Sequence, residues 1–79
     1  MKGKPLFIAA QWDKEAMVWV ATSGDVPGLA TEAVTMEGLV EKLKVMIPEL
    51  LLVNDAAIED EVSFELITRR FEVTQLAER

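Results

Sequence analysis

In two segments near the start of the chain, successive side chains would point to opposite faces of a strand, and apolar residues occupy both faces. Residues 4–12 and 16–22 are rich in aromatic and β-branched side chains, which favour strands over helices. The polar triplet at 13–15 has the length of a hairpin connection, and Asp13 can hydrogen-bond within its own turn. The pattern therefore predicts an antiparallel hairpin with strands at about 4–12 and 16–22.

Residues 23–29 concentrate the side chains that redirect a chain. Pro27 fixes φ and removes a backbone donor, while Gly28 permits a positive φ. A short third strand is expected at about 29–33, antiparallel to the second. The turn has two interpretations: a rigid, partner-binding surface formed by Asp25, Pro27 and Gly28, or a connection that only redirects the chain.

Helical periodicity replaces the alternation at residue 36 and continues to about residue 53. Apolar side chains recur there at steps of three and four, at Leu39, Leu43, Met46, Leu50 and Val53. Thr35 is a suitable N-cap. Pro48 removes one backbone hydrogen bond inside the pattern, so we expect a helix that is either kinked there or broken near residue 47.

Alternation returns near the end and predicts a fourth strand at about 61–73. The apolar residues change sides after Leu66, which indicates either a bulge near residues 68–70 or a twisted edge strand whose halves pack differently. Residues 56–60 are expected to be a connecting loop. The order strand-strand-strand-helix-strand predicts an α+β fold: a four-stranded mixed sheet with one helix on one face.

One helix covers only one face of such a sheet, yet both faces of the predicted hairpin are apolar. The uncovered side chains would form a patch of the size that marks an interface. Scattered exposed apolar residues are also normal on protein surfaces, which is the alternative explanation. Because tryptophan is enriched at the energetic centres of interfaces, Trp12 and Trp19 are candidate contacts. We therefore expect a homodimer or larger assembly, or a protein partner.

Composition narrows the available chemistry. The length of 79 residues predicts a single domain over residues 1–79, and the chain contains no cysteine, histidine or tyrosine. Disulfides, thiolate metal sites and catalysis by cysteine or histidine are therefore excluded. No apolar run is long enough for a signal core or a membrane span, and the lack of cysteine fits a cytoplasmic location.

The net charge of −6 bears on the choice of partner. It repels a phosphate backbone, so no direct binding to nucleic acid is expected. A basic protein partner is better matched, although acidity also keeps small domains soluble. Arg69 and Arg70 have two interpretations as well: anchors for a partner's carboxylate, or charges that protect an edge strand from aggregation.

Three stretches of the sequence together resemble HicB-type antitoxins, over about residues 6–70. They are Trp12-Asp13-x-Glu15-Ala16-x-Val18-Trp19-Val20-Ala21-Thr22-Ser23, then Asp25-Val26-Pro27-Gly28-Leu29, and Thr31-Glu32-Ala33 followed by Thr35-x-Glu37. The chain is most similar to the short, stand-alone branch of that superfamily, whose members are mostly domains of unknown function.

The resemblance implies a partial ribonuclease-H-like fold, with a three-stranded meander and a last strand parallel to the first. It also implies a domain that masks a small basic ribonuclease toxin and often forms dimers or tetramers. Two departures stand out. Only six residues follow the last predicted strand, so no DNA-binding segment is expected, and Glu37-Gly38-Leu39 replaces the usual Glu-Glu-Ala, which weakens the case for a retained toxin-facing surface.

Nuclease activity on this scaffold requires clustered carboxylates on adjacent central strands. Asp13 and Asp25 instead fall in predicted turns, and Glu65 falls on the last strand. The acidic run from Asp55 to Glu61 lacks the ligand spacing of a calcium loop and indicates a solvated loop. We therefore expect no catalytic residues, no metal and no cofactor.

The sequence thus predicts a non-enzymatic protein-interaction module. The first hypothesis is an antitoxin-like protein that binds and masks a small basic ribonuclease. The alternative is an orphan homo-oligomeric structural or adaptor domain without a toxin. A small basic reading frame beside the gene would favour the first hypothesis.

Overall fold

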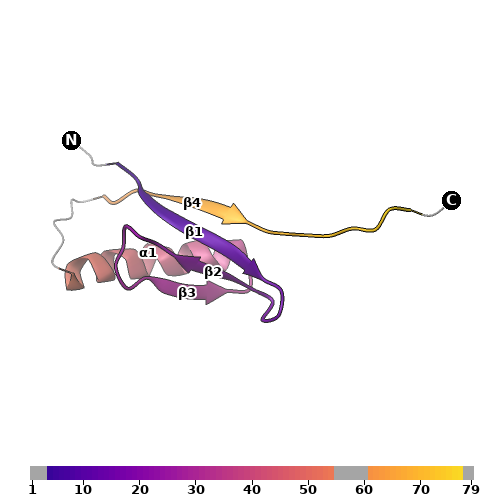
Figure 1. Cartoon of the computed structure of the whole chain (residues 1–79). Coiled ribbons are helices and arrows are strands. Elements are labelled where there is room, and N and C mark those ends of the chain that lie inside the picture. The colour runs from indigo at the N-terminus through magenta and orange to yellow at the C-terminus, as the bar shows by residue number, and fades with distance from the viewer. Residues whose placement is uncertain (1–3, 55–60, 78–79) are drawn as a thin grey trace.

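The computed structural model describes residues 4–54 and 61–77, and its elements follow the predicted order. They are β1 (Leu6–Asp13), β2 (Val18–Thr22), β3 (Ala30–Ala33), α1 (Met36–Val53) and β4 (Phe64–Arg69). The four-stranded sheet has the order β3-β2-β1-β4, with β1 antiparallel to β2, β2 antiparallel to β3, and β4 parallel to β1 (Figure 1). The α+β architecture expected from the sequence is confirmed.

The core lies between α1 and one face of the sheet. Ile8 and Ala10 of β1 and Ala21 of β2 are buried against the helix. The other buried side chains come from the apolar stripe of α1 and from the loop before β3: Leu39, Leu43, Ile47, Leu51, Val26 and Leu29. Each large side chain removed from water contributes about 1.5–3 kcal/mol, so this layer stabilises most of the fold.

Helix α1 begins where the sequence predicts and runs without interruption to Val53. The Thr35 hydroxyl accepts a hydrogen bond from the Gly38 N–H at 3.0 Å, which makes Thr35 the N-cap. The alternative of a helix broken near residue 47 is wrong. Ile47 and Leu51 are both buried, so packing on either side of Pro48 holds the two halves in one helix despite the missing bond.

The hairpin differs from expectation at one residue. Asp13 accepts hydrogen bonds from the N–H groups of Glu15 (3.0 Å) and Ala16 (3.2 Å), as predicted for its turn. Met17, however, lies in that turn with a φ of 60° and is exposed, so it does not belong to a strand face. The second strand therefore starts at Val18 and not at residue 16.

Strand β4 ends at Arg69, before the predicted end at residue 73. It pairs with β1 residue for residue, from Leu6 with Phe64 to Gln11 with Arg69, so the bulge alternative is wrong over this stretch and β4 is a regular edge strand. Pairing stops at Gln11 and Arg69, although β1 continues to Asp13. Residues 70–77, which we call the arm, continue away from the sheet (Figure 1).

The predicted loop at 56–60 lies outside the described residues, as does most of the acidic run that begins at Asp55.

Candidate protein-interaction surface

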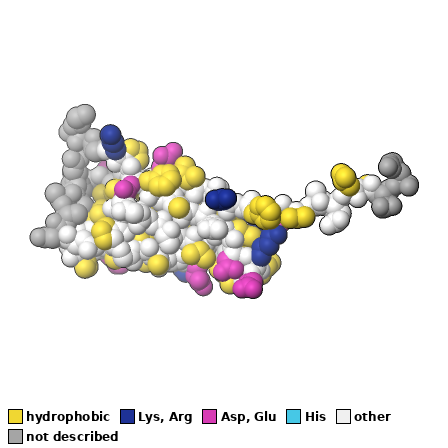
Figure 2. All heavy atoms as spheres, viewed as in Figure 1, with side chains coloured by type: hydrophobic (Ala, Val, Ile, Leu, Met, Phe, Trp, Pro, Cys, Tyr) yellow, Lys and Arg dark blue, Asp and Glu magenta, His cyan; other side chains and the backbone are white. Residues whose placement is uncertain are grey.

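The face of the sheet opposite α1, called the open face, carries an apolar centre. The strand registers place Phe7 and Ala9 of β1 beside Glu65 and Ile67 of β4 on this face. Phe7 is 49% exposed and Ile67 43% exposed, whereas the neighbouring β1 residue Ile8, which faces α1, is fully buried. The hydrophobic side chains form visible patches on the molecular surface (Figure 2). The prediction of apolar side chains on both faces is therefore confirmed.

Acidic side chains share the open face with this apolar centre. The pairing registers place Asp13 of β1, Glu32 of β3 and Glu65 of β4 on it, and Arg69 is the basic residue of the same strand rows. The face thus combines apolar contacts with a net negative charge.

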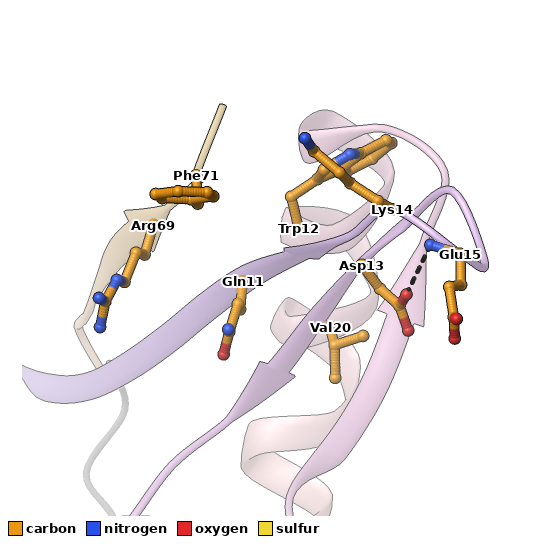
Figure 3. Close-up of a pocket in the computed structure, with 8 residues that line it drawn as sticks. All are labelled: Gln11, Trp12, Asp13, Lys14, Glu15, Val20, Arg69 and Phe71. Atoms are coloured by element: carbon orange, nitrogen blue, oxygen red, sulfur yellow. Dashed lines mark hydrogen bonds between the residues drawn. The ribbon is translucent and has the colours of Figure 1, made fainter. Parts of the chain in front are cut away.

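A groove lies at the hairpin end of the sheet, where β4 leads into the arm. In Figure 3, Arg69 and Phe71 stand on one side of the groove, and Trp12, Lys14 and Glu15 stand on the other. Gln11, Val20 and Asp13 complete its lining. Aromatic rings, charges of both signs and one amide line this groove.

Trp12 and Trp19 face each other across the hairpin at the same end. Their ring centroids are 5.2 Å apart with an interplanar angle of 60°, and the Arg70 guanidinium carbon lies 4.4 Å from the Trp12 ring centre. Trp19 is half-buried and packs against the core. The predicted pair of tryptophans therefore forms one cluster, but part of its surface is already used within the chain.

Glu72 links the arm to this cluster through two cations. Its carboxylate accepts a hydrogen bond from Arg70 Nε at 2.7 Å and lies 3.2 Å from the ammonium group of Lys14. The hydrogen bond from Arg70, and then that from Lys14, lowers the pKa of Glu72 below its usual value. The first residues of the arm are thereby fixed to the hairpin.

Asp25, Pro27 and Gly28 lie elsewhere and make contacts within their own chain. The Asp25 carboxylate accepts a hydrogen bond from the Phe7 N–H at 2.8 Å, and the Pro27 carbonyl accepts one from the Asn54 side chain at 3.2 Å. Gly28 has a φ of 86°, which only glycine adopts without strain. These contacts fix the loop to the start of β1 and to the end of α1, and they supply the structural role considered for this turn.

The structure thus separates the seven predicted contact residues into groups. Trp12, Trp19 and Arg70 form the aromatic cluster, Arg69 lines the groove on the open face, and Asp25, Pro27 and Gly28 belong to the loop. Sequence reasoning missed Phe71 and Glu72 as site residues. The alternation of apolar and polar side chains from Phe71 to Thr74 is the available signal, but by itself it predicts a paired strand.

Two kinds of feature are absent from residues 4–54 and 61–77. No group of three or more acidic side chains in these ranges is arranged to hold a metal ion. Within the same ranges, no helix has the length and apolar character needed to cross a membrane.

Comparisons with known proteins identify a family and one close structural relative. The model of a domain of unknown function, DUF1902, matches residues 5–76. The crystal structure of the hypothetical protein TTHA1013 from the extreme thermophile Thermus thermophilus is 54% identical, and the match covers 90% of this chain and 100% of that one with a TM-score of 0.78. A search of functionally curated proteins finds no match. With nearly its whole length matched, the chain belongs to the DUF1902 family of domains of unknown function.

Proposed function

We propose that this domain is a non-enzymatic, HicB-like interaction module of the cytoplasm that binds and masks a small basic ribonuclease. One observation carries the proposal: the open face presents Phe7 and Ile67 to solvent, although Phe7 belongs to a central strand of the sheet. Removing such side chains from water on binding supplies the main driving force of protein association.

The charge of the open face favours a basic partner over a neutral one. Asp13, Glu32 and Glu65 lie on the open face with one basic residue, Arg69, and the whole chain has a net charge of −6. Opposite charges accelerate encounter and suppress binding of acidic proteins. An acidic surface with apolar anchors can occupy the RNA-binding surface of a ribonuclease, because that surface is itself basic.

The test is inhibition of RNA cleavage by a purified small basic ribonuclease of the toxin class that HicB-type antitoxins mask. Increasing amounts of this protein should reduce cleavage in a saturable way. Phe7→Lys, which replaces an exposed apolar side chain of the open face by a cation, should weaken inhibition at least about tenfold, the loss typical of a removed hot spot.

Val45→Lys provides the matched control. Val45 lies on α1, away from the open face, and is 58% exposed, so this variant makes the same chemical change elsewhere. It should inhibit as the wild type does. No inhibition by the wild-type protein, or equal inhibition by Phe7→Lys and Val45→Lys, would contradict the proposal.

A second candidate function is a homo-oligomeric structural or adaptor domain without a toxin. The arm favours it, since Phe71 and Val73 are 76% and 66% exposed at the end of a strand that has an open edge. The mass of the protein in solution as a function of concentration tests this function. A monomer at every concentration would exclude it.

A further inference from the structure

Strand β4 leaves a row of backbone groups open along one edge of the sheet. The Leu6 N–H of β1 donates to the Ser63 carbonyl at 2.9 Å. In and just before β4, the odd-numbered residues therefore direct their backbone N–H and C=O groups toward β1. Phe64, Leu66 and Thr68 consequently direct their N–H and C=O groups to the opposite side. Among the described residues, no strand pairs with that side, because β4 is last in the sheet order.

The two edges of the sheet differ in how they are protected. Strand β3, at the other edge, has four residues and leads directly into α1. Strand β4 has six residues, contains no proline or lysine, and continues into the extended arm. Proline, short length and charged side chains are the usual protections of an edge strand. Strand β4 has only the charges of Glu65 and Arg69, so it is the edge suited to pair with a chain that presents matching opposite charges.

The arm beyond Arg70 likewise lacks a backbone partner in the described part of the protein, although the Glu72 side chain bonds to Arg70 and Lys14. Within residues 71–77, no backbone hydrogen bond to another part of the described chain is present, and every side chain is exposed. Phe71 and Val73 continue the row of Ile67 on the open-face side, since alternate residues of an extended strand share a side. An extended segment with apolar side chains gains stability when a neighbouring strand satisfies its backbone groups.

We propose that two copies of this chain pair antiparallel through the open edges of β4, with the two-fold axis at Ile67. This register places Ile67 opposite its own copy and Glu65 opposite Arg69 of the second copy. Because of the two-fold symmetry, the dimer contains two such pairs of opposite charges, one on each side of the axis. A register centred on Arg69 would place two like charges opposite each other, which is destabilising.

The hydrogen-bonding pattern agrees with this register. Thr68 lies opposite Leu66 of the second copy, and both residues belong to the set whose backbone groups point to the open edge. Beyond them, Arg70 lies opposite Phe64, and the first residues of the arm extend the pairing. In this register the edge of β4 is complementary to itself, because each of its residues meets a matching residue of the same strand. The partner that fits this edge is therefore a second copy of this chain.

Pairing of this kind would join two four-stranded sheets into one continuous sheet and would keep both open faces on the same side. The interaction at the β4 edge does not rest on the proposed ribonuclease function, because that function uses the face of the sheet. The dimer would place its two open faces side by side and so double the area of this surface.

Single cysteines test the register, because the natural chain contains none. Opposed residues at a non-hydrogen-bonded antiparallel position have Cα atoms about 4.5 Å apart, within disulfide range. Ile67→Cys should therefore form a covalent dimer under mild oxidation. Glu65→Cys and Arg69→Cys should each remain largely unlinked alone, but they should form a mixed disulfide when the two variants are refolded together.

Thr22→Cys is the control, since Thr22 is exposed on the open face of β2, away from the β4 edge. It should cross-link no more than random collision allows. Tryptophan emission and thermal unfolding of each reduced variant verify that the fold is intact.

A wild-type protein that is monomeric at all concentrations would overturn the proposed dimer. Self-linkage of Arg69→Cys in place of Ile67→Cys would overturn the register, and equal linkage of Thr22→Cys would show contact through the face instead. The ribonuclease assay is independent of these outcomes, so the two proposals can fail separately.

Discussion

The guanidinium carbon of Arg70 lies 4.4 Å from the centre of the Trp12 ring, and this contact joins the end of β4 to the hairpin. Arg70 also lies 5.8 Å from the centre of the Trp19 ring and donates a hydrogen bond to Glu72. One side chain therefore connects three segments: both hairpin strands and the arm.

Arg70→Ala should expose the two indole rings to water and shift tryptophan emission to longer wavelength. The loss of a partly exposed cation–π contact should lower the free energy of unfolding by about 0.5–1 kcal/mol. Fluorescence and chemical denaturation measure the two effects. Arg69→Ala removes the same charge from a residue that faces the groove, so it should leave the emission unchanged. Equal shifts in both variants would show that the ring contact is not the cause.

Acidification should detach the arm from the hairpin. The hydrogen bonds from Arg70 and Lys14 lower the pKa of Glu72 in the folded protein, so the carboxylate stabilises the fold at neutral pH. That stabilisation is lost as the pH falls through this lowered folded-state pKa. Carboxyl NMR shifts recorded against pH follow Glu72 directly. Glu72→Gln should abolish the accompanying change in the Trp12 signals, and its persistence would assign the change to another group.

Asp25→Ala should destabilise the start of β1. The variant leaves the Phe7 N–H without the acceptor that now lies 2.8 Å away, and a hydrogen bond of this kind contributes about 1 kcal/mol. Asp25→Asn keeps an acceptor oxygen and should lose less stability than Asp25→Ala. Urea denaturation of both variants measures the difference. Equal, negligible losses would mean that this hydrogen bond does not contribute to the stability of the loop.

Local pattern is sufficient where a residue's role depends on its neighbours in the chain. The helix stripe, the N-cap at Thr35 and the Asp13 turn depend on spacings of a few residues, and the sequence predicts each at the correct position. Pro48 shows the limit of this reasoning. The local rule allows a break, but buried packing by Ile47 and Leu51 keeps the helix continuous.

The interaction residues are only partly predictable, because they depend on pairing between distant segments. Side-chain chemistry indicates Trp12 and Trp19, and the structure brings them together. The turn pattern indicates Asp25, yet its carboxylate bonds to Phe7 across the fold. The alternation places Phe71 inside a strand, since it does not indicate where the neighbouring strand ends.

The sequence by itself determined the order and type of the elements, because the strand period of two and the helix period of about three and a half are local properties of the chain. It also determined that one helix leaves an apolar face uncovered. Only the tertiary structure decided where β4 stops and the arm begins. That point depends on the parallel register between Gln11 and Arg69, which lie at opposite ends of the chain. Register depends on pairing between segments that lie far apart in the sequence, and no local window of sequence contains both partners.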